Sequence, residues 1–368
     1  MIQKIRERFF TPPEDTGGRH NNFNLVRFVA AVMVIYGHMA HLLLAPVPTI
    51  FGQEVSTIAV KIFFVISGFL ITESFLRDEN IIRYGIRRFF RIMPGLIFIT
   101  LLSVFIVGPL LTRFSTGDYF SNPSTYQYLR NGLLHPVYNL PGVFETNPYP
   151  NAVNGSLWSL PVEVAMYLLL PLVLVVFRKL KIMKIGVALT GVAFLVFNIW
   201  RLKYAPDLRF VFWGSNWIDG TMLVPYFFAG SLFSFPEFRR LLNLQWGIAL
   251  AAVAAMLNMN YVKSEILLFI VLPYFILSFS LASRPVFGRW FEKNDYSYGM
   301  YLYGFLVQQT LIFLLGAERF SLLPYTILST VVTLVFAALS WHLVERPCQL
   351  LGKRLLKCRL IARKKEAA

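Results

Sequence analysis

The stretch from Asn24 to Ala45, NLVRFVAAVMVIYGHMAHLLLA, is long and apolar enough to cross a lipid bilayer. It nevertheless contains Arg27, His38 and His41, and polar side chains at membrane depth are costly enough to suggest a function. Arg27 and His38 are eleven residues apart. That spacing is three helical turns plus about 20°, so both side chains lie on one helix face, with a rise of about 16 Å between them. A cation near the membrane surface and an imidazole near its middle favour an anionic ligand with a long reactive arm.

Each of these residues also has a structural interpretation. Arg27 could anchor the helix by extending to the interface, and His38 could be a polar group bonded to a neighbouring helix. His41 lies three residues further on, near the outer half of the span, where polarity costs less. We therefore interpret His41 as part of the rim.

The composition is that of a membrane protein. The chain has 368 residues, of which 56% are hydrophobic, and its mean hydropathy is +0.58, a value that soluble domains rarely reach. The formal net charge is +16, but the Lys and Arg residues occur in short runs between apolar segments, so nucleic acid is not predicted as a partner. The two cysteines, Cys348 and Cys358, lie in the basic tail and indicate no disulfide framework, and no metal site is predicted.

Ten apolar segments are predicted to span the membrane, which makes the fold an all-α, polytopic helical bundle. The segments are 24–45, 57–76, 94–112, 157–177, 185–200, 217–235, 246–257, 265–281, 297–315 and 322–344. The fifth is marginal in length, and the seventh is too short for a straight crossing. The predicted organisation is an N-terminal segment (1–23), a transmembrane domain (24–347) and a basic tail (348–368).

The distribution of Lys and Arg predicts the orientation of this bundle. With the N-terminus inside, the inside segments contain 26 of the 35 Lys and Arg residues, the outside loops contain 7, and Arg27 and Lys61 lie in spans. An excess of cations on the cytoplasmic side is the general rule for such proteins. Both termini are therefore predicted to be cytoplasmic, with the loop 113–156 outside.

A second group of cations, Arg83 to Arg91 (RYGIRRFFR), precedes the third predicted span. Arg88 and Arg91 are three residues apart and so are neighbours on a helix. A guanidinium group matches the geometry of a phosphate, which favours a phosphate-binding site; the alternative is a plain topological signal. Pro94 follows at the position where we expect the next helix to start.

Glu163 lies inside the apolar span 157–177, where a carboxylate must be protonated, paired or facing water. His38 is a candidate partner, because a carboxylate next to a histidine would orient it and stabilise its charge as a general base. The alternative is a structural ion pair with Arg27 or another cation within the membrane.

Other charged residues near the predicted spans have structural interpretations. Lys61 is expected to extend its ammonium group to the interface, and Glu265 to lie at the interface. Ser67 and Gly68 are expected to allow close helix contact. The sequence Glu345-Arg346-Pro347 is expected to end the last helix.

Six blocks along the chain resemble the membrane acyltransferase-3 family, whose members acylate sugars and other hydroxylated or amino acceptors at the cell envelope. The blocks are Asn24–His38 with its Arg-x10-His spacing, KIFFVISGFLIT at 61–72, RRFFRIMP at 87–94, SLWSLPVEVAMYLLLP at 156–171, YSYGMYLYGF at 296–305 and LSWHLVERP at 339–347. Together they cover nearly the whole chain. Their order on a polytopic protein is more specific than any single block.

The resemblance implies that His38 is catalytic, with Arg27 as its motif partner, and that Arg88 and Arg91 act on the cytoplasmic acyl donor. Glu163 matches the acidic position of the family. The implied donor is acetyl-CoA or another acyl-CoA, as a co-substrate and not a bound cofactor. The implied acceptor is a hydroxyl of a cell-surface or lipid-linked glycan, and the implied location is the bacterial inner membrane, in contact with its lipid.

The chain departs from the family pattern at two positions and resembles the form without an appended hydrolase-like domain. Asn24 stands where the family often has Asp, and Gly304 stands where the late block often has His, which bears on the acceptor. An alternative of another class is a transporter or flippase of a lipid-linked glycan, because buried charges and proline-containing helices also suit transport. A third is a membrane scaffold, in which His38 and Glu163 would tolerate substitution.

Overall fold

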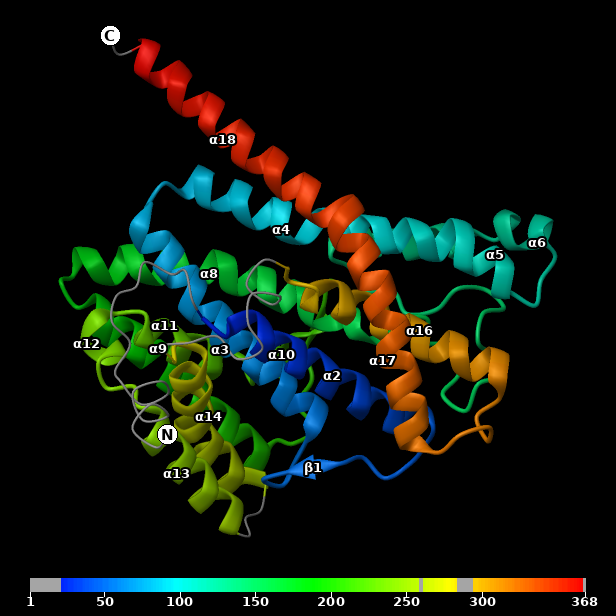
Figure 1. The fold of residues 1–368 in the computed structure, drawn as a ribbon, viewed down its shortest axis with the longest axis horizontal. Coiled ribbons are helices and arrows are strands. Elements are labelled where there is room, and N and C mark those ends of the chain that lie inside the picture. The colour runs from blue at the N-terminus through cyan, green and yellow to red at the C-terminus, as the bar shows by residue number, and fades with distance from the viewer. Residues whose placement is uncertain (1–20, 258–260, 283–293, 367–368) are drawn as a thin grey trace, which may run out of the picture.

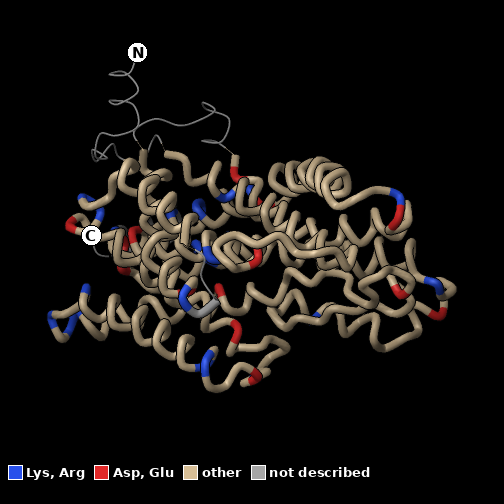
Figure 2. Tube along the Cα trace, turned by 90° about the horizontal axis from the view of Figure 1, so that it is seen from below, with Lys and Arg blue, Asp and Glu red and all other residues tan. Residues whose placement is uncertain are grey.

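The computed structural model describes residues 21–257, 261–282 and 294–366, which are mainly helical (Figure 1). Eight helices in these ranges are long and apolar enough to cross a membrane. Figure 2 shows that long stretches of the chain carry no charged residue. The prediction of an all-α, polytopic membrane protein is confirmed. The helices that supply the spans are α2 (Phe23–Leu42), α3 (Val55–Arg77), α4 (Ile81–Leu102), α8 (Ser159–Lys179), α9 (Met183–Tyr204), α14 (Tyr261–Ser280), α16 (Ser297–Leu315) and α17 (Leu322–Ser340).

Short elements connect or extend these spans. Beyond α4 the chain continues through η1 (Ser103–Val107), α5 (Gly108–Leu111), α6 (Thr116–Ser121), α7 (Pro123–Gln127) and η2 (Tyr128–Leu133), and η3 (Gly155–Trp158) leads into α8. Two antiparallel two-stranded ribbons pair β1 (Thr49–Ile50) with β2 (Gln53–Glu54) and β3 (Val211–Phe212) with β4 (Ser215–Asn216). The remaining elements are α10 (Trp217–Thr221), α11 (Val224–Phe233), α12 (Pro236–Arg239), α13 (Leu244–Met256), η4 (Trp341–Glu345) and α18 (Arg346–Glu366).

Two of the ten predicted spans are not single long helices. The segment 217–235 is divided into α10 and α11, and Pro225 lies in the first turn of α11, where a proline is well tolerated. The segment 246–257 lies in α13, which has 13 residues and is therefore shorter than a straight crossing requires.

Two prolines that were expected to mark helix ends lie within continuous helical segments. Helix α4 begins at Ile81 and passes through Pro94, so the basic run shares one helix with the third span. Helix α17 continues through the π turn η4 into α18, and Pro347 is the second residue of α18, directly after the π turn, where the regular hydrogen-bond pattern is already interrupted. The predicted helix start at Pro94 and helix stop at residues 345–347 are therefore wrong.

Helices α3 and α11 pack with their backbones in close approach. A Cβ atom added to Gly68 would lie 1.8 Å from the carbonyl oxygen of Phe227, and one added to Gly230 would lie 2.0 Å from that of Val65. Small residues allow such approach between membrane helices. The expected packing role of Gly68 is confirmed, and this contact fixes α3 at the centre of the bundle.

A fully buried ion pair joins α3 to α14. Both Lys61 and Glu265 have side chains with 0% exposure, and their Nζ and Oε2 atoms are 2.6 Å apart. Gln53 and Tyr226 complete the cluster, because Gln53 bonds both charged groups and the Tyr226 hydroxyl donates to the carboxylate. The expected extension of the Lys61 ammonium to the interface is therefore wrong, because it lies inside the bundle, whereas the depth of Glu265 in the membrane stays a prediction. Desolvated charges persist in a low-dielectric interior only when they are paired and hydrogen-bonded, as here.

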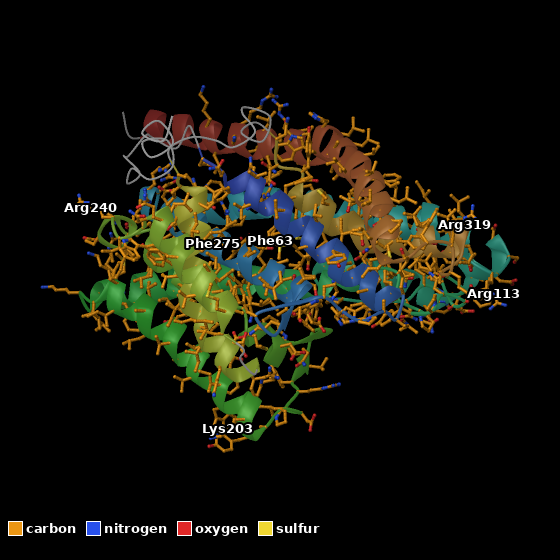
Figure 3. All side chains as sticks on the ribbon, turned by 60° about the horizontal axis from the view of Figure 1, so that its bottom comes forward. Phe63, Arg113, Lys203, Arg240, Phe275 and Arg319 are labelled. Atoms are coloured by element: carbon orange, nitrogen blue, oxygen red, sulfur yellow. The ribbon has the colours of Figure 1, made fainter. Side chains whose placement is uncertain are left out.

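Some of the cations that the charge count assigns to opposite sides lie far apart in the bundle, although Lys203, also predicted to be outside, lies at the lower edge of Figure 3 and at neither end. Figure 3 shows Arg240, predicted to be cytoplasmic, at the left end and Arg113 and Arg319, predicted to be outside, at the right end. Phe63 and Phe275 lie between them. Which end faces the cytoplasm stays a prediction.

Gly68→Ala is expected to destabilise the fold, because the added methyl group meets a backbone carbonyl that cannot move alone. Overpacking of this kind costs about 1–3 kcal/mol. Thermal unfolding in detergent measures the loss. Gly85→Ala is the matched control, since a Cβ at Gly85 meets nothing within 4 Å. Equal melting temperatures for the two variants would contradict the close contact.

Glu265→Ala is expected to cost about 3–5 kcal/mol, because it leaves the Lys61 ammonium buried without its partner. The double variant Lys61→Met/Glu265→Leu removes both charges and is expected to recover most of the lost stability. The same unfolding measurement tests both. A double variant as unstable as Glu265→Ala would mean that the ion pair is not the source of the loss.

Candidate active site

A cavity of about 490 Å³ opens among α2, α3, α4, α8, α16 and α18. Pockets for small organic ligands are typically of this size. Its charged lining residues are Arg27, Arg87, Arg88, Arg91, Glu163, Asp295 and Lys353. All three arginines predicted as donor-binding and the predicted catalytic carboxylate are therefore brought together in one cavity. His38 is not among the residues that line it.

Asp295, immediately before α16, links two of the predicted arginines. Its Oδ2 atom is 3.0 Å from Nη1 of Arg27 on α2 and 2.6 Å from Nη2 of Arg91 on α4. Its Oδ1 atom accepts hydrogen bonds from the hydroxyl and the backbone N–H of Ser297. Burial alone would raise the pKa of the Asp295 carboxyl, but Arg91 and Arg27 lower it to about 2. The carboxylate is therefore ionised at neutral pH and neutralises part of the charge of two guanidinium groups.

Arg88 has a different environment from its neighbours on α4. Its guanidinium lies 5.9 Å from the ring centre of Tyr84 and 5.8 Å from that of Tyr167, a cation–π arrangement. Its Nε atom is buried without a hydrogen-bond partner. Within the described residues, no carboxylate forms an ion pair with Arg88. The planar group is thus held by two aromatic rings with hydrogen-bonding capacity left for an anion.

Arg83 and Arg87, by contrast, are paired with Asp78 in the turn between α3 and α4. The carboxylate of Asp78 lies 2.5 Å from Arg83 and 2.8 Å from Arg87. Hydrogen bonds from Arg83 hold the pKa of the Asp78 carboxyl well below its usual range. These two arginines therefore form a local ion-pair network at the start of α4.

Glu163 on α8 lines the cavity and is bonded to hydroxyl groups. The Tyr167 hydroxyl, one turn further along α8, donates to its Oε1, and the Ser67 hydroxyl lies 3.4 Å from the same atom. No hydrogen bond joins Glu163 to His38, although both residues are described, so the predicted pair is not formed in this structure. Because Tyr167 also lies against Arg88, Glu163 is linked through Tyr167 to an arginine of the cavity.

His38 lies further along α2, beside α16. Its ring packs edge-on against Phe305, with 5.4 Å between ring centres. Phe305 is one helical turn beyond Tyr301, which lines the cavity. One turn of α2 before His38, the carbonyl of Ile35 accepts a hydrogen bond of 2.7 Å from the fully buried Gln308. His38 thus lies outside the cavity lining and contacts Phe305, which is one helical turn along α16 from the lining residue Tyr301.

His41 lies at the rim, as expected. It is 3.0 Å from Glu54 at the end of β2, and both side chains are more than 40% exposed. Its partner and exposure differ from those of His38, although only three residues separate them in sequence.

The sequence reasoning did not identify Asp295, Tyr84 or Tyr167. Asp295 lies 268 residues from Arg27, and the sequence between them contains no signal of the pairing. Its position directly before the apolar span 297–315 was the available clue, since a carboxylate at a span end needs a partner. The two tyrosines resemble ordinary aromatic residues of a membrane helix.

Comparison with known proteins adds to this geometry. The sequence model of the family described as "Acyltransferase domain" matches residues 20–342. The "O-acetyl transferase" of Shigella phage Sf6 is 30% identical over 334 residues, 89% of this chain and 96% of the phage protein. "Nodulation protein 10" of Rhizobium leguminosarum bv. viciae is 30% identical over 377 residues, 94% of this chain and 98% of that protein. No solved structure gives a significant match. Because the family model matches most of the chain and both relatives align over nearly their full lengths, this chain belongs to the membrane acyltransferase-3 family.

Proposed function

We propose that this protein transfers an acyl group, most simply acetyl, from cytoplasmic acyl-CoA to a hydroxyl of a cell-surface or lipid-linked glycan. The observation that carries the proposal is Arg88, which lines the cavity and forms no ion pair with a carboxylate among the residues that the structure describes. The printed name of the phage relative supports O-acetylation. In this proposal the protein lies in the bacterial inner membrane with both termini in the cytoplasm.

The cationic lining of the cavity suits an anionic acyl donor. Coenzyme A is an anionic nucleotide with an extended thiol arm. In ranges 21–257, 261–282 and 294–366, Arg88 has no competing carboxylate, whereas Arg27 and Arg91 share Asp295. Phosphates bound at Arg88 would leave the arm to run along the cavity toward Tyr301, at the end that is one turn from Phe305. The bidentate fit of guanidinium to phosphate supports this placement.

In the proposed transfer step, His38 is the proton acceptor. The acceptor hydroxyl attacks the thioester carbonyl carbon, a C–O bond forms and the C–S bond breaks. His38 takes the hydroxyl proton and returns it to the departing thiolate. A histidine suits this task because its unperturbed pKa of about 6.5 lies near working pH. A competing route has His38 as the nucleophile, through an acyl-histidine intermediate.

Glu163 is the second carboxylate in the proposal. Its bonds to Tyr167 and Ser67 favour a role on the donor side, through Tyr167 and Arg88. The helper role toward His38 that the sequence suggested requires Glu163 to leave these partners. Glu163→Gln is therefore expected to cost less activity than loss of His38.

A flippase for a lipid-linked glycan remains the alternative of another class, and Pro94, Pro171 and Pro273 within α4, α8 and α14 suit it. Membranes given radiolabelled acetyl-CoA separate the two functions. Label on a glycan that depends on His38 supports the enzyme. Movement of acceptor without acyl donor supports the flippase.

Arg88→Ala is expected to weaken acetyl-CoA binding roughly tenfold or more, because it removes a charged hydrogen-bond donor. Arg88→Lys is expected to bind acetyl-CoA less tightly than wild type, since Lys lacks the planar guanidinium group. Equilibrium binding of radiolabelled acetyl-CoA to purified protein measures both. Arg83→Ala is the control, since it removes the same charge from the same helix outside the cavity. Wild-type affinity for acetyl-CoA in the Arg88→Ala variant would contradict the proposed donor site.

His38→Ala is expected to lower the transfer rate by about 10²–10⁴-fold while donor binding stays intact, because only the general base is lost. His41→Ala is the control and is expected to keep activity. Acyl label that remains on wild-type protein without acceptor, and is absent from His38→Ala, would favour the covalent route. Near-normal transfer in His38→Ala would contradict both routes.

A further inference from the structure

Helix α18 lies against the mouth of the cavity. Figure 1 shows it leaving the bundle after α17 and running toward the C-terminus, and its first half packs against α4. A Cβ atom added to Gly352 would lie 2.8 Å from the ring of Phe90, so the helix is seated closely on α4. The π turn η4 joins it to α17 without a break. The beginning of the basic tail is therefore a structured wall of the cavity.

One face of α18 contributes polar groups to that wall. Gln349, Gly352 and Lys353 line the cavity, and their spacing of three and four residues places them on one side of the helix. The Nε2 atom of Gln349 is buried and has no hydrogen-bond partner among the residues that the structure describes. A buried amide N–H₂ group without an acceptor is costly, and a ligand oxygen in the cavity would supply that acceptor.

The charges around the cavity are unevenly compensated. It is lined by five cations and only two carboxylates. Asp295 pairs with Arg27 and Arg91, and Arg87 is paired with Asp78 outside the cavity. In the described part of the chain, this leaves Arg88 and Lys353 as the cavity cations with no carboxylate in an ion pair. They come from two helices, α4 and α18, that pack against each other.

We propose that α18 completes the donor site, with Lys353 and Gln349 binding a phosphate group of the acyl-CoA together with Arg88. The inference rests on the function proposed above and adds residues outside its motifs. The ligand chemistry is a phosphate ester, which an anionic lipid headgroup also offers. The nucleotide is favoured because Gln349 lines the cavity and its Nε2 atom is buried, away from bulk lipid. Gly352 serves the site by letting α18 approach Phe90.

The test measures donor binding by purified full-length variants in nanodiscs of neutral phosphatidylcholine. Lys353→Ala is expected to weaken competition by CoA against radiolabelled acetyl-CoA about tenfold, and Gln349→Leu by a smaller factor. Competition by pantetheine, which lacks phosphate, is expected to stay unchanged. Lys357→Ala, which removes the same charge one turn further along α18 and outside the cavity, is expected to match wild type. Lys353→Arg, which keeps the charge, is expected to retain binding.

The outcomes separate this inference from the function on which it rests. If wild type binds acetyl-CoA, Arg88→Ala loses it and Lys353→Ala equals Lys357→Ala, the role of α18 is wrong and the donor site stands. If wild type binds no acetyl-CoA, both proposals fail. If the Lys353→Ala effect appears only in nanodiscs with anionic phosphatidylglycerol, the residue binds a lipid headgroup and the nucleotide assignment is overturned. A Lys353→Ala protein with an altered melting temperature is replaced by Lys353→Gln in the same comparison.

Discussion

The ion pairs of Asp295 with Arg27 and Arg91 are the interaction on which the candidate site depends. They join α2, α4 and the segment before α16, which are far apart in sequence. A guanidinium in an apolar bundle must be compensated, and one carboxylate shared between two guanidinium groups leaves the site cationic overall. The arrangement therefore stabilises the helix contacts and keeps an attraction for anions. An apolar contact at this position could hold the helices together but would provide no such attraction.

The second buried ion pair, Lys61 with Glu265, has the opposite character. Both charges are fully buried, and Gln53 and Tyr226 satisfy the remaining hydrogen-bonding groups. Nothing in this cluster is left for a ligand. The contrast between the two networks supplies a criterion within one protein: complete mutual satisfaction indicates structure, and an unpartnered polar atom that faces a cavity indicates binding. By this criterion Arg87, Arg88 and Gln349 are candidate ligand-binding residues, and Lys61 is not.

Much of the candidate site could be predicted from sequence because helical periodicity and hydrophobicity are local properties. They identified the helix that carries Arg27 and His38, the adjacent Arg88 and Arg91, and the costly position of Glu163. The side chains that pair with these residues, in contrast, cannot be predicted from local sequence. Glu265 looks interfacial until Lys61, 204 residues away, is seen beside it, and Glu163 was matched to His38 although Tyr167, one turn away, holds it. Pro94 and Pro347 would mark helix ends if no tertiary contact favoured continuation of the helix. Here α4 packs against α18, and this packing outweighs the local cost of a proline within each helical segment.

The separation of the cavity arginines from His38 determines how donor binding could contribute to the proposed reaction. About 16 Å of helix rise lies between Arg27 and His38, so phosphate contacts do not touch the bond that breaks. Contacts that are equally strong in the ground state and the transition state improve binding without accelerating chemistry. They contribute to rate only if they hold the thioester in position for attack. In the proposed reaction, the contacts of Arg88 with Tyr167 and of Tyr167 with Glu163, on α4 and α8, would give the donor arm a fixed origin. Because His38 packs against Phe305, one helical turn beyond the cavity residue Tyr301, the positioning of the thioester would be decided over that last turn.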